Sequence, residues 1–396
     1  MNNGRRKSSA SLRLAIVKEL VARHLHASSA SGILHLVHRT SDFVLPGKGG
    51  FLKNSRSFIN RLDSRWDGCI ILRMSAIPWV TMLVASVAAD YTNPIAQPGQ
   101  PGYVAKPTHH FRGMFENDSA FGKDRNYSHG TRFDYAQQAC GNHYWGVSLT
   151  QNIYTPETHT DGRVWNQHPY AGYLAIGGAW MYRGEDVGSS LELQLGVTGK
   201  PSFAENSQWF VHAIGNMEQW DGWGDQIPAE PTVQLSARQD WRLDCCESES
   251  KGGFQTDGLI FTREAVGTVD ISGGVGLVLR WGYNLPDAMQ VNGNHAADYG
   301  VGLLRKSAYD PTRSSWFIVG SVYGEYVARD MFIDGGVFHD FEQTCSRQPW
   351  QAEVQLGVGV VHKGIHYYAG AMWHTVEYRT QDHDAMFGTF SISWNW

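Results

Sequence analysis

Charged residues are scarce in this chain, making up only 18% of its 396 residues. Glycine and aromatic residues are abundant instead, with 44 Gly, 15 Trp, 17 Tyr and 17 Phe. This composition is typical of proteins rich in strands and turns. It argues against a disordered or mainly helical chain.

Several sequence patterns are absent. No stretch between Asp90 and Trp396 supplies the roughly 20 continuous apolar residues that a membrane-spanning helix needs, so a membrane role requires strands. No G-x-S-x-G motif occurs, which excludes a serine hydrolase of the α/β type. No CxxC metal spacing occurs either. Beyond Cys69, we interpret Cys140, Cys245, Cys246 and Cys345 as loop or strand-end residues, with a disulfide staple as the alternative.

The first 89 residues indicate targeting rather than folding. Residues 1–73 hold 13 Lys or Arg and 4 Asp or Glu, a net charge of +9, while the rest of the chain has 20 and 34, a net of −14. Residues 74–89 form an apolar run that ends in small residues, which predicts a signal peptide cleaved before Asp90. The basic leader 1–73 is either transit-like or, as we favour, a gene-model extension preceding a true start near Met74. Residues 90–110, rich in Pro, Gly and Gln, are expected to be an extended lead-in.

From residue 111 onward, apolar and polar residues alternate as they do in β-strands. We expect about twelve strands, at Phe111–Asp118, Tyr127–Gln138, His143–Asn152, Tyr170–Tyr182, Ser190–Val197, Thr232–Trp241, Gly258–Val266, Ile271–Tyr283, Trp316–Arg329, Gln351–His362, His366–Arg379 and Phe387–Trp396. An even number in this range, with polar residues on one face, predicts an all-β, antiparallel transmembrane β-barrel over residues 111–396 in the outer membrane of a Gram-negative bacterium. The aromatic last residue fits recognition by the barrel-assembly machinery. A soluble periplasmic β-sandwich is the alternative.

One segment, Ser202 to Glu230, departs from the strand pattern. Its Phe203, Trp209, Phe210 and Ile214 recur at helical spacing, which predicts a short helix. In such a helix Gln208 and His212 lie one turn apart on the same side, so a titratable imidazole lies beside an amide. This is either a functional site or a structural plug helix whose histidine is merely hydrogen-bonded.

Two polar clusters lie at strand ends. Glu116-Asn117-Asp118 is oxygen-rich and suits Ca²⁺, although Asn and Asp also favour ordinary turns. Ser128, in Asn126-Tyr127-Ser128-His129-Gly130, could act as a nucleophile, a ligand or a hydrogen-bond donor. A lone serine in such a place is more often structural.

Eight motifs in order resemble one family, the outer-membrane lipid A 3-O-deacylases. They are Glu116-Asn117-Asp118, Tyr127-Ser128-His129-Gly130, Gln151-Asn152-Ile153-Tyr154-Thr155-Pro156, Pro169-Tyr170-Ala171-Gly172-Tyr173-Leu174, Leu195-Gly196-Val197-Thr198-Gly199, Gln208 with His212, Gly222-Trp223-Gly224-Asp225-Gln226 and Glu377-Tyr378-Arg379-Thr380-Gln381. The resemblance covers roughly Phe111 to Trp396. It implies a twelve-stranded barrel with a helical segment beside it, forming a site near the outer leaflet.

The resemblance also implies a Ca²⁺-dependent ester hydrolysis, similar to that of secreted phospholipase A2, on the 3-linked acyl group of lipid A. In it His212 is the general base, Asn117 and Asp118 belong to the cation and oxyanion region, and Ser128 supplies a small hydroxyl. Gln208, Glu218, His168 and Tyr170 are the expected substrate-binding residues. Asn117, Asp118 and Glu218 are the expected metal ligands.

One motif departs from the family pattern. Many relatives have Asp-Arg where this chain has Gln167-His168, so a fixed positive charge that could meet a lipid A phosphate is replaced by a titratable one.

Two other functions are open. The chain could be a non-catalytic barrel, or an outer-membrane phospholipase that uses Ser128 as its nucleophile. As partners we expect lipopolysaccharide, the outer membrane and the barrel-assembly machinery, with no nucleic acid and a monomeric state.

Overall fold

The computed structural model describes residues 108–122, 125–158, 164–215, 220–250, 253–286, 293–300, 303, 310, 312–339, 341 and 344–396. The predicted leader, the signal peptide and the lead-in up to residue 107 lie outside these described residues.

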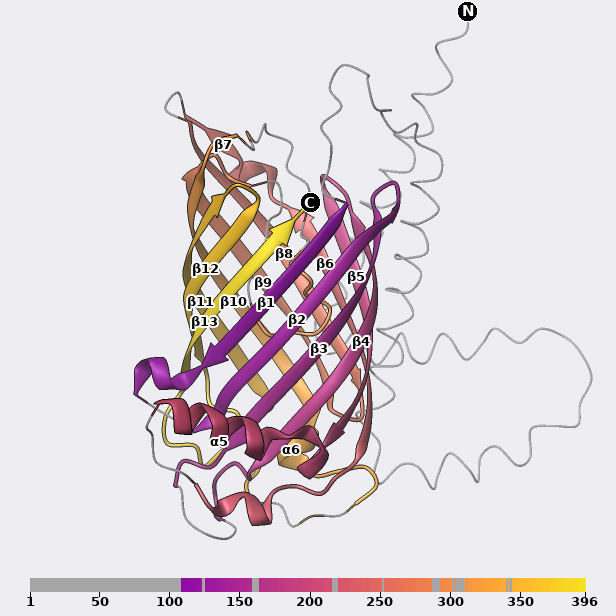
Figure 1. The fold of residues 1–396 in the computed structure, drawn as a ribbon, viewed down its shortest axis with the longest axis vertical. Helices are drawn as coiled ribbons and strands as arrows, with labels where there is room; N and C mark the ends of the chain where they lie inside the picture. The colour runs from indigo at the N-terminus through magenta and orange to yellow at the C-terminus, as the bar shows by residue number, and fades with distance from the viewer. Residues whose placement is uncertain are drawn as a thin grey trace, which may run out of the picture. The chain divides into compact units, whose positions relative to one another are not determined.

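Within the described residues, twelve antiparallel strands form one closed β-barrel (Figure 1). They are β1 (His109–Asn117), β2 (Asn126–Cys140), β3 (His143–Thr155), β4 (Ala171–Arg183), β5 (Val187–Thr198), β6 (Pro231–Arg242), β8 (Phe254–Gly267), β9 (Asp270–Tyr283), β10 (Ser315–Asp330), β11 (Trp350–His362), β12 (Ile365–His374) and β13 (Ala385–Asn395). Each strand pairs with its neighbour in sequence, β6 pairs with β8, and β1 pairs with β13. A two-residue strand, β7 (Ser248–Glu249), pairs with β8 and is not part of the ring.

The predicted barrel fold is therefore confirmed, and each predicted strand overlaps an observed one. The largest error is at the eleventh strand, which was expected to run to Arg379 but ends at His374. After that residue the main chain turns toward the segment before β11, because Gln348 donates to the carbonyl of Glu377 and Arg379 donates to that of Ser346. The first strand likewise ends at Asn117, and Asp118 begins a 3₁₀ helix.

Strand alternation separates a polar interior from an apolar exterior. On β5, Glu192 and Gln194 point inward and are buried, whereas Leu193 and Leu195 are 47% and 50% exposed on the outside. Other large apolar side chains, such as Ile176 on β4 and Leu356 on β11, are exposed in the same way. An apolar outer band around a polar lumen is the pattern of an outer-membrane barrel.

The lumen is filled in part by residues 293–300, which come from the connection between β9 and β10. Their main-chain and side-chain groups bond to inward-facing charges of the wall. The amide of Ala297 donates to Glu192 Oε2 at 2.5 Å, and the Tyr299 hydroxyl donates to Glu192 Oε1 at 3.0 Å. Glu192 in turn pairs with Arg132, whose Nη2 lies 3.1 Å from Oε2. Wall and plug thus share one buried ion network.

Helical elements other than η5 (Asp244–Cys246) gather at the barrel end opposite the chain's C-terminus (Figure 1). They are η2 (Asp118–Phe121), η3 (Lys200–Ser202), α5 (Ala204–Gly215), η4 (Gly222–Asp225) and α6 (Met331–Asp334). None of the helices in the described part of the chain is long and apolar enough to cross a membrane. The four cysteines of the described residues are free thiols.

Removing Arg132 tests the ion network. Arg132 and its partners Asp134 and Glu192 are fully buried, so Arg132→Met leaves two carboxylates with one fewer counter-charge. We expect a loss of about 3–5 kcal/mol in the free energy of unfolding, measured by guanidinium titration in lipid vesicles. Arg313→Ala is the control, since its ion pair with Asp310 is exposed and should contribute nothing measurable. Unchanged stability of Arg132→Met would show that the network is not needed.

Candidate functional site

A small pocket lies between the barrel wall and helix α5, at the helical end of the barrel. The wall contributes Asn117 and Ser119 at the end of β1, Ser128 and His129 from β2, and Ile153 from β3; the helix contributes Ser207, Gln208, Val211 and His212. Four residues predicted for the site, namely Asn117, Ser128, Gln208 and His212, therefore line one pocket. They come from chain segments that are almost 100 residues apart.

Asn117 organises the wall side of the pocket. It caps η2, because its Oδ1 accepts the Ser119 amide at 2.8 Å, as Asn commonly does at a helix start. Its Nδ2 donates to the carbonyl of Ser128 at 3.1 Å, which ties the end of β1 to β2. Both side-chain atoms are thus held in place by the local fold.

Ser128 occupies a β-bulge. In the pairing of β2 with β3, Tyr127 faces Tyr154 and His129 faces Ile153, so Ser128 is the extra residue. Bulges re-aim a side chain and occur beside functional sites. The buried Ser128 hydroxyl lies 2.5 Å from Thr155 Oγ1.

Helix α5 confirms the predicted helix but turns its polar side to the protein. Gln208 and His212 are only 7% and 5% exposed, whereas Trp209, Phe210 and Ile214 are 61%, 60% and 72% exposed. The helix packs against β3 and β4. A helix that buries an amide and an imidazole while exposing large apolar side chains does not form an ordinary hydrophobic core contact.

Two tryptophans contact the buried polar side chains of α5. Trp223 Nε1 donates to Gln208 Oε1 at 2.7 Å, and the Tyr170 ring packs on Trp223 with centroids 5.1 Å apart. The Gln208 Nε2 group is buried and has no hydrogen-bond acceptor within the described residues. His212 meets the edge of Trp220 at 5.3 Å. Tyr170 therefore supports Gln208 through Trp223 and does not line the pocket, and its role in substrate binding stays a prediction.

His168 lies away from the pocket. It is 1% exposed, stacks on Tyr154 at 5.0 Å, and its Nδ1 donates to the carbonyl of Pro169 at 2.7 Å. Burial lowers the pKa of His168 below its ordinary value of 6.5, which favours the uncharged ring. A buried imidazole thus stands where the resemblance implies a fixed positive charge, and substrate binding by His168 also stays a prediction.

Three cations elsewhere in the chain could compensate for the missing arginine, namely Lys200, Arg183 and Arg163. Arg183 stands at the far end of β4, and Lys200 is exposed just before α5. Arg163 lies outside the described residues. Of the two cations in the described residues, Lys200 is the one that lies next to helix α5.

The metal ligands expected from the sequence stay a prediction. Asp118 is buried directly after Asn117, and its Oδ2 accepts the Arg125 amide at 2.7 Å. Glu218 lies outside the described residues. The lining of the pocket offers amide and hydroxyl oxygens from Asn117, Ser128 and Gln208, which are donors that suit a hard cation such as Ca²⁺.

Three residues to which the sequence assigned no role also shape the pocket: Thr155, Trp220 and His129. Thr155 closes the Gln151–Pro156 motif and pairs with Asn126 across the strands, so strand register would have found it. His129 lies in the same motif as Ser128, but nothing in that motif shows that it reaches the pocket. Trp220 follows no sequence pattern that marks it, because its contact with His212 depends on tertiary packing.

Known proteins were compared with the chain. A family model described as "Outer membrane protein LpxR" matches residues 79–396. Among solved structures, LpxR from Salmonella typhimurium matches with a TM-score of 0.63 at 16% identity, covering 72% of this chain and 100% of that chain. A search of curated proteins found no match.

More distant structures share little beyond strands. The β domain of the Bordetella autotransporter BrkA matches at 10% identity with a TM-score of 0.35, covering 74% of this chain and 99% of its own. The translocator domain of the autotransporter NalP from Neisseria meningitidis matches at 7% identity with a TM-score of 0.34, covering 81% and 96%. Because the family model spans most of the sequence, this outer-membrane β-barrel belongs to the LpxR family, as its resemblance to the outer-membrane lipid A 3-O-deacylases predicts.

Proposed function

We propose that this protein is an outer-membrane esterase that removes the 3-linked acyl group of lipid A, or of a closely similar acylated lipid, with His212 as general base. The observation that carries the proposal is the pocket where Asn117, Ser128, Gln208 and His212 meet. Those four residues are the ones to which the family resemblance assigns the reaction.

The surroundings of the pocket suit an acylated lipid. Trp209, Phe210 and Ile214 expose apolar surface on the helix that forms one wall of the pocket. A helix with large apolar side chains on its outer face is suited to lie against acyl chains at a membrane interface. An ester bond between a sugar and a fatty acid would then meet the imidazole at the boundary between polar and apolar layers.

The reaction follows from the groups in the pocket. His212 takes a proton from a water molecule, whose oxygen attacks the ester carbon to form a tetrahedral intermediate. The carbon–oxygen bond to the sugar then breaks, and the protonated His212 gives its proton to the leaving sugar oxygen. The products are a free fatty acid and a sugar hydroxyl. The amide of Gln208, whose Nε2 has no acceptor among the described residues, can donate to an ester oxygen and orient it.

Asn117, Asp118 and Glu218 would hold a Ca²⁺ ion beside this pocket. Such an ion supplies positive charge that stabilises the negative charge developing on the ester oxygen. Asn117 would bring a neutral amide oxygen, and Asp118 a carboxylate from the first turn of η2.

The architecture of the barrel supports one orientation in the membrane. The C-terminus lies at the barrel end opposite α5 (Figure 1), and the start of β1 is beside it, because His109 and Trp396 bond to each other through their main chains. We assign the α5 end to the outer leaflet, where lipopolysaccharide resides. The protein would be exported by a signal peptide that is cleaved near Ala89, inserted by the barrel-assembly machinery, and active as a monomer.

Ser128 is the less favoured nucleophile. Its hydroxyl bonds to Thr155 at 2.5 Å, so it is held as part of the bulge. The bulge and this hydrogen bond support a structural role for Ser128, with water as the nucleophile.

Substituting His212 and Ser128 separates these mechanisms. We expect His212→Ala to lower lipid A deacylation by about 10²–10⁴-fold, because the base is lost, and Ser128→Ala to weaken it only partly. The measurement is mass spectrometry of lipid A from cells producing each variant. His362→Ala, which changes an exposed histidine at the other barrel end, is the control.

Complete loss of activity in both His212→Ala and Ser128→Ala, with a trapped acyl-serine in the native chain, would assign the reaction to Ser128. Unaltered lipid A with the native chain at saturating Ca²⁺ would instead make the protein a non-catalytic barrel.

Removing Ca²⁺ tests the cation. We expect excess chelator to abolish deacylation in detergent micelles and added Ca²⁺ to restore it. Asp118→Asn should raise the Ca²⁺ concentration needed for half-maximal activity by about tenfold or more, because one ligand charge is lost. Heat-modifiable migration on gels checks that the variant is folded. Full activity in excess chelator would rule out the metal.

A further inference from the structure

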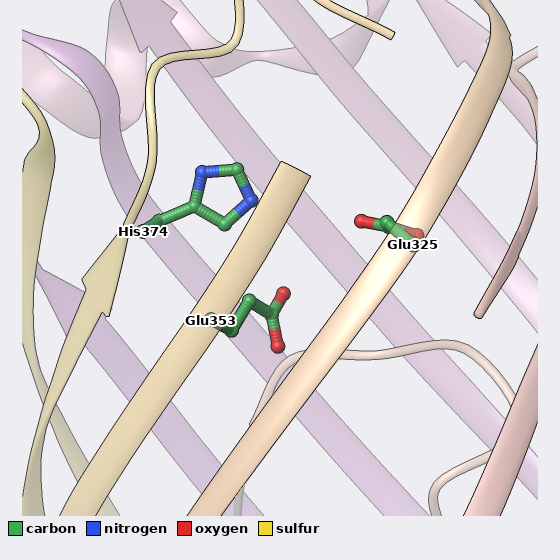
Figure 2. Close-up of side chains that lie close together, drawn as sticks. All are labelled: Glu325, Glu353 and His374. Carbon is green, nitrogen blue, oxygen red and sulfur yellow. The ribbon is translucent and has the colours of Figure 1, made fainter. Parts of the chain in front are cut away.

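A second group of metal-ligating side chains lies inside the barrel, in a cavity distinct from the pocket beside α5. Glu325 on β10, Glu353 on β11 and His374 on β12 come from three adjacent strands. Each has a ligand atom within 4.8 Å of the others, and it is the one such group of His, Cys, Asp or Glu found in the described residues. Figure 2 shows the three side chains converging on one space between their strands.

Strand register fixes this arrangement. Glu353 is directly opposite His374, and it is also opposite Tyr323, two residues from Glu325 on the same face of β10. All three side chains therefore point inward from hydrogen-bonded strands. Ligands carried on rigid strands keep their spacing without help from a loop.

The His374 ring is prepared to act as a ligand. It is 7% exposed, and its Nδ1 donates to the main-chain oxygen of Thr375 at 2.7 Å. That bond occupies Nδ1 and leaves Nε2 as the ring atom that can bind a metal, which is the usual arrangement of a metal-binding histidine. Figure 2 shows this side of the ring turned toward the two carboxylates.

The surrounding cavity is lined by more acidic than basic side chains. It has a volume of about 270 Å³, and its described lining includes seven carboxylates against two arginines. One of the two arginines, Arg132, already forms ion pairs with Asp134 and Glu192. The other, Arg263, lies 3.4 Å from Glu353. Buried carboxylates in such excess need protons or a bound cation.

We propose that Glu325, Glu353 and His374 bind one divalent transition-metal ion, such as Zn²⁺, in the barrel lumen. One imidazole and two carboxylates form a nitrogen and oxygen ligand set that suits such ions, and the cavity has room for water as a further ligand. The ion links β10, β11 and β12 and offsets the excess lumen charge. This site is separate from the Ca²⁺ pocket, because Glu116 and Tyr127 face the lumen cavity while the next residues, Asn117 and Ser128, line the pocket beside α5.

Zinc binding by the full chain tests the proposal. The protein is folded in detergent micelles, stripped with chelator and equilibrated by dialysis with Zn²⁺. We expect one tightly bound Zn²⁺ per chain by elemental analysis. X-ray absorption at the zinc edge should show oxygen and a single imidazole as neighbours, and no sulfur. Glu353→Gln and Glu325→Gln should each weaken Zn²⁺ binding by about 100-fold or more, since direct ligands matter at least as much as the groups that orient them.

Matched variants keep the test decisive. Glu264→Gln removes a carboxylate from the same cavity but outside the group of three, and should bind Zn²⁺ as the native chain does. His212→Ala should also retain the ion. Heat-modifiable migration selects the ligand variants that fold. The proposal is overturned if the folded native chain retains no Zn²⁺, if both ligand variants bind as Glu264→Gln does, if sulfur neighbours appear, or if His212→Ala loses the ion.

Discussion

The closed ring of hydrogen bonds between twelve strands is the constraint on which the rest of this structure depends. In a bilayer no water is present to satisfy main-chain groups, so a sheet must close on itself, here through β6 with β8 and β1 with β13. Closure also places one face of each strand against lipid and the other face against the polar lumen. Apolar side chains such as Leu193 face lipid, and charged ones such as Glu192 must be satisfied inside.

The interior meets that requirement through paired charges and a plug. Residues 293–300 enter the lumen and donate main-chain and hydroxyl hydrogens to Glu192, while Arg132 supplies the counter-charge. Farther toward α6, carboxylates outnumber arginines, and Glu325, Glu353 and His374 converge there. The same alternation that makes the barrel a membrane protein thus concentrates polar chemistry on its inner surface.

The α5 pocket uses an interruption of this regularity. At Ser128 the strand bulges, at Asn117 the first strand ends in a cap, and a helix lies across the gap with its polar side inward. Each departure brings at least one polar side chain to the same pocket. The bulge, the capped strand end and the helix with its polar side toward the protein are all local features. The candidate site forms only where the three lie together.

By itself, the sequence determined the twelve strands, the short helix and the outer-membrane setting. Alternation and helical spacing can be seen along the sequence, because each face of a strand or helix needs side chains that match its surroundings. It also indicated His212, Gln208, Asn117 and Ser128, through motifs of the family. Only the tertiary structure decided that these four meet, that His168 is buried against Tyr154, and that β12 ends at His374. Those outcomes depend on packing between segments that are far apart in sequence. The convergence of Glu325, Glu353 and His374 was likewise invisible, since it follows from the register of three strands and not from any spacing along the chain.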